Sequence, residues 1–407
     1  MTKKIAIIGS ALSGNKGAAA MLESAIQTLG DEDTEFTLLS MYPASDAQQN
    51  VYSNLKIVDA SPLRLGVVIN SLALAYRLFP PLRKTICAKS SAMKSLVEAD
   101  VLLDQGGITF VDGREKFLLY NIASILPALN VKTPVVKCAQ ALGPFSNPIN
   151  RFAAKTYLPK VTAIVSRGRI THKYLQDLQL SNVFAGADYA FSLELTKQEA
   201  TNAKTKFDAT KLHGKKIVGV SPSQVMQKKV DAAGGDYANE IAMFIDAVVS
   251  QGHAVMLVPH SVRSNQDKMH NNDMPLCKNI YSRLKDKKDS ILFLNKELGS
   301  QELRYWIGEC DYFVASRFHA MVSSLAMGVP TLVVGWSHKY REVLEMFELE
   351  EWAMEQNDFS VDTLEERLKQ LINDEELVRR KLKQHLPEVK AKSRVQVDVI
   401  NEVVKGN

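Results

Sequence analysis

The stretch ASRFHAMVSSLAMGVPTLVVGWSHKYREV, from Ala315 to Val343, decides how we interpret the whole chain. An apolar run, CDYFVAS, leads into it, and a second apolar run, TLVVGW, follows its helical middle part. Gly328 and Pro330 are typical of the point where a helix ends and the chain turns back. The pattern predicts a strand, a helix and a second strand, that is, a β-α-β unit.

Basic and polar residues follow both predicted strands, with Arg317 and His319 after the first and Ser337, His338 and Lys339 after the second. The strands of a β-α-β unit are parallel, so both groups are expected at one edge of the sheet. The free N–H groups in the first turn of the predicted helix point toward the same edge of the sheet. This arrangement would suit a phosphate or a carboxylate. The alternative is a hydrogen-bonded structural histidine and a solvated lysine.

Composition limits the class of protein. The chain has 407 residues, 46% of them hydrophobic, which is enough for about two domains. The net charge of +5, without a run of five basic residues, argues against nucleic acid as a partner. The four cysteines form no CxxC pair, which is typical of reduced thiols in a cytoplasmic protein.

Short apolar runs alternate with helix-length segments along the chain, which indicates α/β architecture with parallel sheets covered on both faces. We expect two doubly wound domains, at 1–200 and 211–386, because the polar stretch from Leu195 to Lys216 separates two such series. A final helix is expected at 387–407, with packing on the first domain as one option. The predicted strands lie at 4–10, 35–40, 54–60, 100–106, 134–142, 162–167, 182–188, 217–223, 253–260, 291–295, 310–316 and 330–336.

Residues 61–94 differ from the rest because an apolar segment is flanked by Arg64, Arg77, Arg83 and Lys84. One interpretation is a core-facing helix with a basic rim. The other is an interfacial helix that contacts an anionic membrane, at the inner face of a cytoplasmic membrane, as an enzyme acting on a lipid-linked sugar would use.

A glycine-rich turn, GSALSGNKGAAAM, follows the first predicted strand and enters a helix. It lacks the Lys-Ser/Thr pair of a P-loop and the G-x-G-x-x-G spacing. We expect Ser13, Gly14, Asn15 and Lys16 to approach a ligand there, with a tight turn that requires glycine as the alternative.

Three further turns carry polar residues. In DQGGITFVDG, Gly106 and Gly107 would let a sugar approach the main chain, and Gln105 or Asp112 would hydrogen-bond to its hydroxyls. The alternative is that the glycines are needed only for the conformation of the turn. Arg151, after GPFSNP, falls in the first turn of a predicted helix, where a cation is tolerated more easily beside a bound anion. A surface arginine is the other interpretation.

The turn VPHSVRSNQDKMHNND places His260 in a polar substrate loop, and its spacing matches no metal motif.

Taken together, these motifs resemble those of the polysaccharide pyruvyl transferase family. The pieces are GNKGAAAM, DVLLDQGGITFVDG, QALGPFSNPINR, AIVSRGRITHKYLQDL, GADYAF and SRFHAMVSSLAMGVPTLVVGWSHK, which together cover nearly the whole chain. The resemblance implies two Rossmann-like domains in a GT-B-like arrangement. It also implies transfer of a pyruvyl group from phosphoenolpyruvate to a sugar, usually as a ketal, without a metal or other cofactor.

The resemblance also assigns roles to residues. His319 matches the family's histidine and is the expected acid–base group, because imidazole exchanges protons near neutral pH. Lys339 is the second expected catalytic residue, because its charge would stabilise the departing phosphate. Lys339, Arg151 and Arg317 are expected to hold the donor, with Ser337 and His338 beside them. Gly168 stands where the family often has an acidic residue, and Asp188 is followed by Tyr189 rather than proline, which bears on acceptor choice.

Two rival functions share these features. A GT-B glycosyltransferase would hold the diphosphate of a nucleotide sugar at the same helix start, and we find no ribose-binding carboxylate in the second domain. A non-catalytic sugar-binding or scaffold protein would have a degenerate site, whereas His319, Lys339 and Arg151 are all present.

Overall fold

The computed structural model describes residues 2–263, 271–285, 288–335 and 338–406. The chain forms two compact units. Unit 1 comprises residues 1–13, 18–193 and 390–407, and unit 2 comprises residues 14–17 and 194–389. The short segment at 14–17 therefore belongs to unit 2, although residues on both sides of it belong to unit 1.

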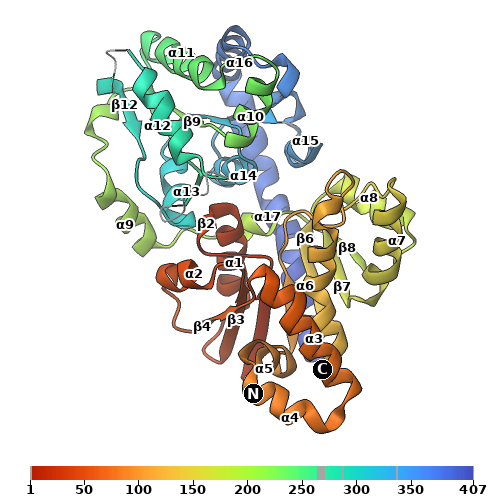
Figure 1. Ribbon diagram of the computed structural model, residues 1–407. Coiled ribbons are helices and arrows are strands. Elements are labelled where there is room, and N and C mark those ends of the chain that lie inside the picture. The colour runs from red at the N-terminus through yellow and green to blue at the C-terminus, as the bar shows by residue number, and fades with distance from the viewer. Residues whose placement is uncertain (1, 264–270, 286–287, 336–337, 407) are drawn as a thin grey trace. The chain divides into compact units, whose positions relative to one another are not determined.

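Unit 1 is built on a seven-stranded sheet whose strands are all parallel, in the order β4-β3-β1-β5-β6-β7-β8 (Figure 1). The strands are β1 (Lys3–Ile8), β3 (Thr34–Ser40), β4 (Leu55–Asp59), β5 (Val101–Asp104), β6 (Val135–Gln140), β7 (Ala163–Ser166) and β8 (Val183–Ala185). The order reverses between β1 and β5, which is the switch point of a Rossmann-like sheet. Its inner strands β5, β6 and β7 are buried throughout, as expected where a sheet is covered on both faces.

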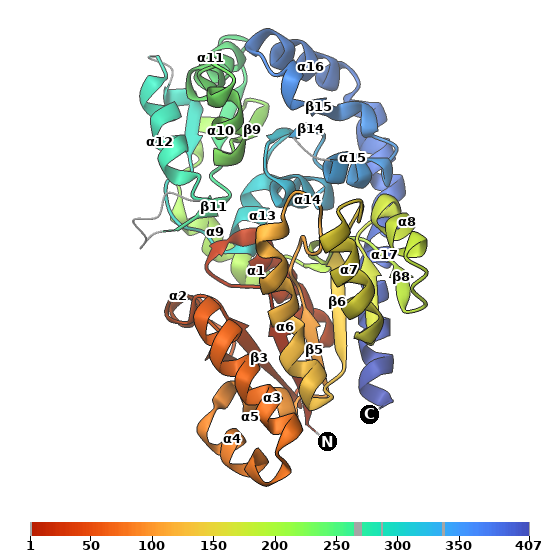
Figure 2. The same cartoon turned by 45° about the vertical axis from the view of Figure 1, so that its right-hand side comes forward.

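Helices of unit 1 cover this sheet, and α3, α5 and α6 lie on one face of it (Figure 2). Leu65 and Ile69 of a π-helical turn, with Met93 and Ile125, pack there against strand residues such as Leu102. The helices are α1 (Lys16–Leu29), α2 (Pro43–Gln49), α3 (Asn70–Leu78), α4 (Arg83–Lys89), α5 (Ser91–Glu98), α6 (Leu118–Val131), α7 (Pro148–Tyr157) and α8 (Arg169–Asp177). No helix among the described residues is both long and apolar enough to cross a membrane.

Unit 2 repeats the same plan with six parallel strands in the order β12-β10-β9-β13-β14-β15, so its switch point lies between β9 and β13. The strands are β9 (Ile217–Ser221), β10 (Ala254–Leu257), β12 (Ile291–Phe293), β13 (Tyr312–Ala315), β14 (Thr331–Gly335) and β15 (Ala353–Glu355). The helices are α9 (Lys197–Lys206), α10 (Gln224–Ala232), α11 (Tyr237–Ser250), α12 (Met274–Arg283), α13 (Ser300–Gly308), α14 (Phe318–Ala326), α15 (His338–Glu345) and α16 (Val361–Asn373). The predicted architecture of two Rossmann-like domains is confirmed.

The last helix, α17, runs from Glu375 to Lys405 and is longer than the helix expected from residue 387. Its first part is fixed in unit 2, where Arg379 donates hydrogen bonds to the carbonyls of Asp311 and Gly328. Its last part is fixed in unit 1, where the Ser393 hydroxyl lies 2.7 Å from the hydroxyl of Ser192. One continuous helix thus contributes to the core of both units.

Candidate functional site

The site is built at the switch point of unit 2, where β13 ends and α14 begins. Arg317 is extended and occupies the position before the helix, so that His319 lies in the first helical turn. N–H groups in a first turn have no partner within their own helix, which makes the position suited to an anion. The helix begins where the sequence predicted it.

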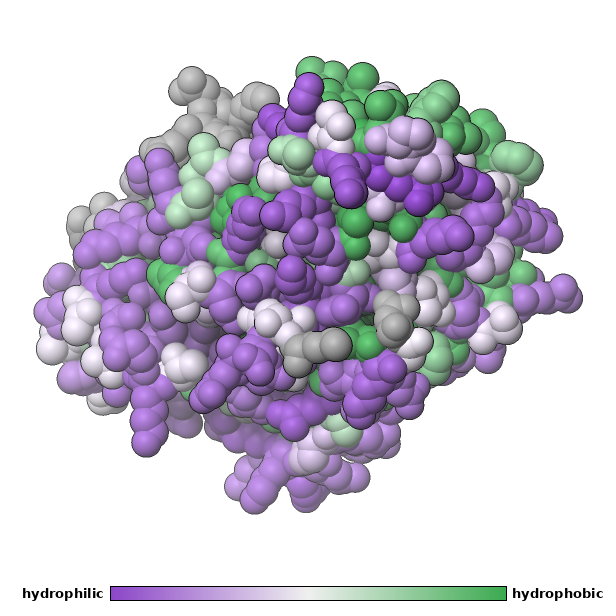
Figure 3. Space-filling view, turned by 90° about the horizontal axis from the view of Figure 1, so that it is seen from below, coloured by the Kyte–Doolittle hydropathy of each residue, from purple (hydrophilic) through white to green (hydrophobic). Residues whose placement is uncertain are grey.

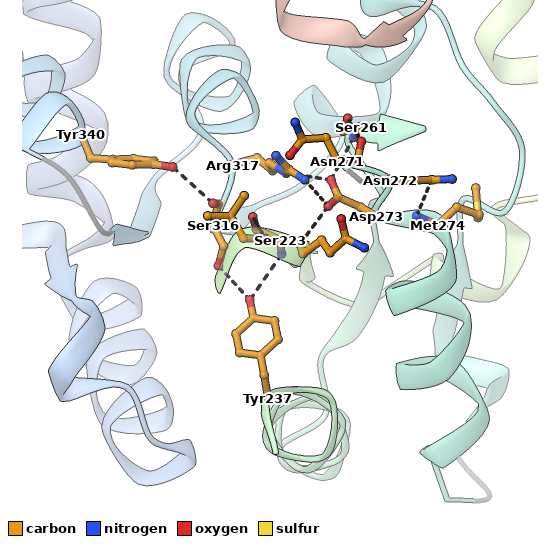
Figure 4. A network of polar contacts seen from close by, with 12 residues as sticks. Ser223, Tyr237, Ser261, Asn271, Asn272, Asp273, Met274, Ser316, Arg317 and Tyr340 are labelled. Atoms are coloured by element: carbon orange, nitrogen blue, oxygen red, sulfur yellow. Dashed lines mark hydrogen bonds and ion pairs between the residues drawn. The ribbon is translucent and has the colours of Figure 1, made fainter. Parts of the chain in front are cut away.

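Arg317, whose side chain is 17% exposed, forms an ion pair with the fully buried Asp273, which lies immediately before α12 (Figure 4). Its Nε–H donates to Oδ2 at 2.8 Å and its Nη2–H to Oδ1 at 2.5 Å. Asp273 is fully buried and also accepts the backbone N–H groups of Ser261 and Gln224, each at 3.0 Å. The sequence predicted that Arg317 holds the donor; in the structure its charge is matched by Asp273, so the pair first orients the start of α14.

A second polar network supports the end of β13. The Tyr237 hydroxyl donates to Ser316 Oγ at 3.1 Å, and the Tyr340 hydroxyl donates to the Ser316 carbonyl at 3.4 Å (Figure 4). Burial raises the pKa of Tyr237 above its ordinary value, so its hydroxyl stays protonated and keeps donating. Ser316 is therefore held by side chains from α11 and α15.

His319 and Lys339 both contact the ring of Phe318. The imidazole meets this ring edge-on with 5.1 Å between centroids, and Lys339 Nζ lies 5.0 Å from the ring centre. Lys339 is 9% exposed and also lies over the ring of Tyr340. The β-α-β unit thus brings the two predicted catalytic residues to one aromatic side chain. Ser337 lies outside the described residues, and His338 is the first residue of α15.

The glycine-rich segment 14–17 lies against His319. Gly14 and Asn15 form strand β2, which pairs antiparallel with β11 (Ser261–Val262). Lys16 is 2% exposed and forms an ion pair with Glu297 at 3.1 Å. The main chain at Gly17 is so close to the imidazole that a Cβ placed there would lie 2.0 Å from His319 Nδ1.

His260 lies near Lys16 and His319. It is buried in the short segment that connects β10 to β11. Burial lowers its pKa well below 6.5, and the nearby charges of His319, Arg317, Lys16 and Arg304 lower it further. Its imidazole is therefore neutral at pH 7. We call the four charged or ionisable neighbours, Lys16, Arg304, Arg317 and His319, the basic cluster. Arg304 was missed in the sequence because it lies within α13, far from any glycine-rich turn.

The lowered pKa of His260 predicts a pH-dependent stability of unit 2. Below pH 6.5 and above the lowered pKa, the unfolded chain binds a proton that the folded protein does not. Acidification through this window should lower the free energy of unfolding by up to about 1.4 kcal/mol per pH unit. His260→Gln should flatten this slope. The measurement is urea unfolding followed by tryptophan fluorescence, since Trp306, Trp336 and Trp352 all fall within 194–389. An equal slope in wild type and variant would contradict the prediction.

The ion pair of the buried Asp273 predicts a large stability effect of its own. Asp273→Asn should lower the free energy of unfolding of unit 2 by about 3 kcal/mol or more, because it leaves the Arg317 charge without its carboxylate. Asp236→Asn is the matched control, since Asp236 pairs with Arg283 at the surface and such pairs contribute about 0–1 kcal/mol. Equal losses in the two variants, measured by the same urea unfolding, would show that the Asp273 pair contributes no more to the free energy of unfolding than a surface pair.

The remaining predicted residues lie in unit 1 and serve turns there. The Ser13 N–H and hydroxyl both donate to buried Asp46. Gln105 is buried and its Nε2 donates to the Met21 carbonyl at 3.1 Å. The Gly106 N–H donates to the side-chain Oδ1 of Asp104, and the Gly107 carbonyl accepts from the Ala141 N–H.

Asp112 shapes the turn that leads to Arg151. Its carboxylate accepts the backbone N–H groups of Ser146 and Asn147, at 2.6 and 3.0 Å, and the Asn150 side-chain amide at 2.7 Å. Asn147 caps α7, and Arg151 lies exposed in the first turn of that helix. Arg151 therefore belongs to unit 1, whereas His319 and Lys339 belong to unit 2.

Two buried ion pairs at the carboxyl ends of the unit 1 strands were missed in the sequence. Lys137 of β6 pairs with Asp104 of β5, and Arg167 pairs with Asp188 at 3.4 Å. The available signal was a lysine within the apolar run PVVKCAQAL, since a charge in a strand covered on both faces requires a partner. In the part of the chain that the structure describes, no three His, Cys, Asp or Glu side chains gather as a set of metal ligands.

Solved structures with a similar fold include proteins that act on nucleotide sugars. One is a complex of *S. aureus* MnaA with UDP, at a TM-score of 0.63 and 12% identity, covering 99% of this chain and 97% of that one. A putative UDP-N-acetylglucosamine 2-epimerase from *Listeria monocytogenes* has the same TM-score at 10% identity, with 100% and 98% covered. *E. coli* ADP-heptose LPS heptosyltransferase II scores 0.50 at 13% identity, with 92% and 99% covered. These likenesses concern the fold, which is that of GT-B-like proteins.

Sequence comparison identifies the family. The amylovoran biosynthesis protein AmsJ of *Erwinia amylovora* is 22% identical over 379 residues, which cover 86% of this chain and 87% of AmsJ. The family model of polysaccharide pyruvyl transferases matches residues 15–338, a range that begins in β2 and ends beside Lys339. The chain therefore belongs to the polysaccharide pyruvyl transferase family.

Proposed function

We propose that the protein transfers the pyruvyl group of phosphoenolpyruvate to two hydroxyls of a sugar in a polysaccharide or its precursor, forming a ketal and releasing phosphate. The observation that carries this proposal is the basic cluster beside His260, which includes His319 in the first turn of α14. Phosphoenolpyruvate carries a carboxylate and a phosphate close together, so its binding requires several cations at fixed positions.

The residues of unit 2 would have different roles in the reaction, because their surroundings differ. Lys339, held over the Phe318 ring beside His319, is the group that would stabilise the departing phosphate. His319 would exchange protons with the attacking hydroxyl. Arg317, already paired with Asp273, would fix the start of the helix and add positive potential to the site. Neutral His260 can accept or donate a hydrogen bond without adding charge.

The reaction balances in atoms and protons, because the two hydroxyls release two protons while the methylene carbon and the departing phosphate take up one each. A proton adds to the methylene carbon of the donor, and a first sugar hydroxyl bonds to the neighbouring carbon and loses its proton. The carbon–oxygen bond to phosphate then breaks, and a second hydroxyl attacks the same carbon and loses its proton. The products are a cyclic ketal that carries a methyl and a carboxylate, and free phosphate.

The acceptor would be held by unit 1 and by residues 14–17. Arg151, exposed in the first turn of α7, would supply a further cation for the donor. Ser13, Gln105 and Asp112 already bond to protein groups, so we assign them to the shape of the acceptor turns. Sugar contacts are then expected from the main chain of Gly106 and Gly107.

Thermal unfolding with two ligands separates this proposal from the alternative of a glycosyltransferase that uses a nucleotide sugar. Phosphoenolpyruvate should raise the melting temperature, because a ligand at 100 times its Kd stabilises the folded state by about 2.7 kcal/mol. Lys339→Ala should reduce the shift, whereas Lys211→Ala, at an exposed lysine, should not. A shift with UDP-N-acetylglucosamine and none with phosphoenolpyruvate would contradict the proposal.

A further inference from the structure

One exposed surface of unit 1 is apolar where a helix normally carries polar side chains. The π-helical turn at 64–69 and α3 bury one stripe, Leu65, Ile69 and Ala73, in the core. Leu63, Val67, Leu74 and Leu78 form a second stripe, spaced by four, seven and four residues, and these side chains are between 48% and 81% exposed. A helix that is apolar on both sides is normally buried on both sides.

The exposed stripe continues onto neighbouring elements. Phe79, at the end of α3, is 54% exposed, and Leu119, in the first turn of α6, is 80% exposed. Helices α3 and α6 run side by side in parallel, because Asn70 bonds to Ala123 and Arg77 bonds to Asn130, both 53 residues further on. The same offset places Leu119 level with residue 66 of the π-helical turn. We call Leu63, Val67, Leu74, Leu78, Phe79 and Leu119 the apolar face.

Basic side chains outnumber acidic ones around the apolar face. Residues 61–94 contain six lysines and arginines and no aspartate or glutamate. Arg83, Lys84 and Lys89, on α4, are exposed. Arg64 is also exposed and forms a surface pair with Asp59 at 3.3 Å. Figure 3 shows hydrophobic side chains gathered at the upper right of the molecule, beside hydrophilic ones.

We propose that the apolar face, with the lysines of α4, docks on an anionic membrane surface. Apolar side chains that enter the headgroup region and basic side chains that meet anionic lipids are the two components of interfacial binding. An apolar protein partner would match the apolar face but would leave the excess of basic residues in 61–94 unexplained. This inference concerns where the enzyme works and does not depend on the identity of the donor.

Vesicle co-sedimentation of the full-length protein tests this proposal. Phosphatidylcholine vesicles that contain phosphatidylglycerol should carry the protein into the pellet, and pure phosphatidylcholine vesicles should not. Added salt should weaken the binding, because it screens the attraction of Lys84 and Lys89 to the anionic surface. Lys84→Gln with Lys89→Gln should weaken binding by about 30-fold, at about 1 kcal/mol for each basic residue. Leu74→Ser, Leu78→Ser and Phe79→Ser together should abolish it.

Matched controls lie in unit 2. Met243→Ser with Leu377→Ser removes exposed apolar side chains there, and Lys211→Gln with Lys228→Gln removes the same charge. Both should bind as wild type does, and equal melting temperatures show that each variant is folded.

Three results would overturn the proposal. These are wild-type protein that stays in the supernatant with both vesicle types, an apolar-face variant that still binds, and a dimer in sedimentation velocity that the apolar-face variant converts to monomer. The last result would assign the surface to a second copy of the chain.

Discussion

His319→Asn is expected to lower kcat for pyruvyl transfer on the order of 10²- to 10⁴-fold, the usual contribution of a positioned general acid or base. The dissociation constant of phosphoenolpyruvate should change far less, because Lys339 and the other cations remain. Asparagine keeps a polar group in the first turn of α14 but cannot take up a proton. The measurement is acceptor-dependent release of phosphate under saturating donor.

The matched control is His253→Asn. His253 precedes β10 and so lies at the amino ends of the unit 2 strands, the edge opposite to the site. Its replacement should leave kcat unchanged. If His319→Asn turns over like wild type, or loses only donor affinity, then His319 is a binding residue and another group moves the proton.

Gly17→Ala is expected to lower kcat by about 10²-fold or more without unfolding the protein. A Cβ at this position would lie 2.0 Å from His319 Nδ1 and 2.3 Å from Cγ, much closer than nonbonded atoms approach. Either the imidazole or the segment at 14–17 must move, and alanine itself is well tolerated in a helix such as α1. The loss should therefore appear in turnover rather than in the free energy of unfolding.

Gly66→Ala is the control for this substitution, because a Cβ there would meet no atom within 4 Å. Turnover and melting temperature are compared for both variants. A Gly17→Ala enzyme with wild-type turnover would mean that the close approach of Gly17 to His319 has no part in catalysis.

The fold could be predicted from the sequence because its signals are local. Continuous apolar runs such as VLLD and YFVA mark strands covered on both faces, and alternation with helices leaves the Rossmann-like sheet as the simplest arrangement. The position of His319 could be predicted in the same way, because a residue that follows a parallel strand lies at the edge of the sheet where the strands have their carboxyl ends.

Other features depend on contacts between distant residues, which no local pattern reports. Asp273 lies in a polar turn with several other candidates, and only the fold shows that it faces Arg317, 44 residues away. Gly14 and Asn15 have no strand propensity, and they form β2 because β11 supplies the partner. Pro387 indicated a helix boundary, yet α17 continues through it. The bonds of Ser13 to Asp46, and of Asp112 to the turn before α7, were likewise not visible in the sequence.

The most direct test of the central claim uses the organism that carries the gene. Its polysaccharide is compared by NMR, through the methyl signal of a pyruvyl ketal, before and after the gene is deleted and after wild type or His319→Asn is restored. We predict that the signal disappears on deletion, returns with the wild-type gene and stays absent with His319→Asn. A ketal signal that persists after deletion would contradict the assignment of this chain as the pyruvyl transferase.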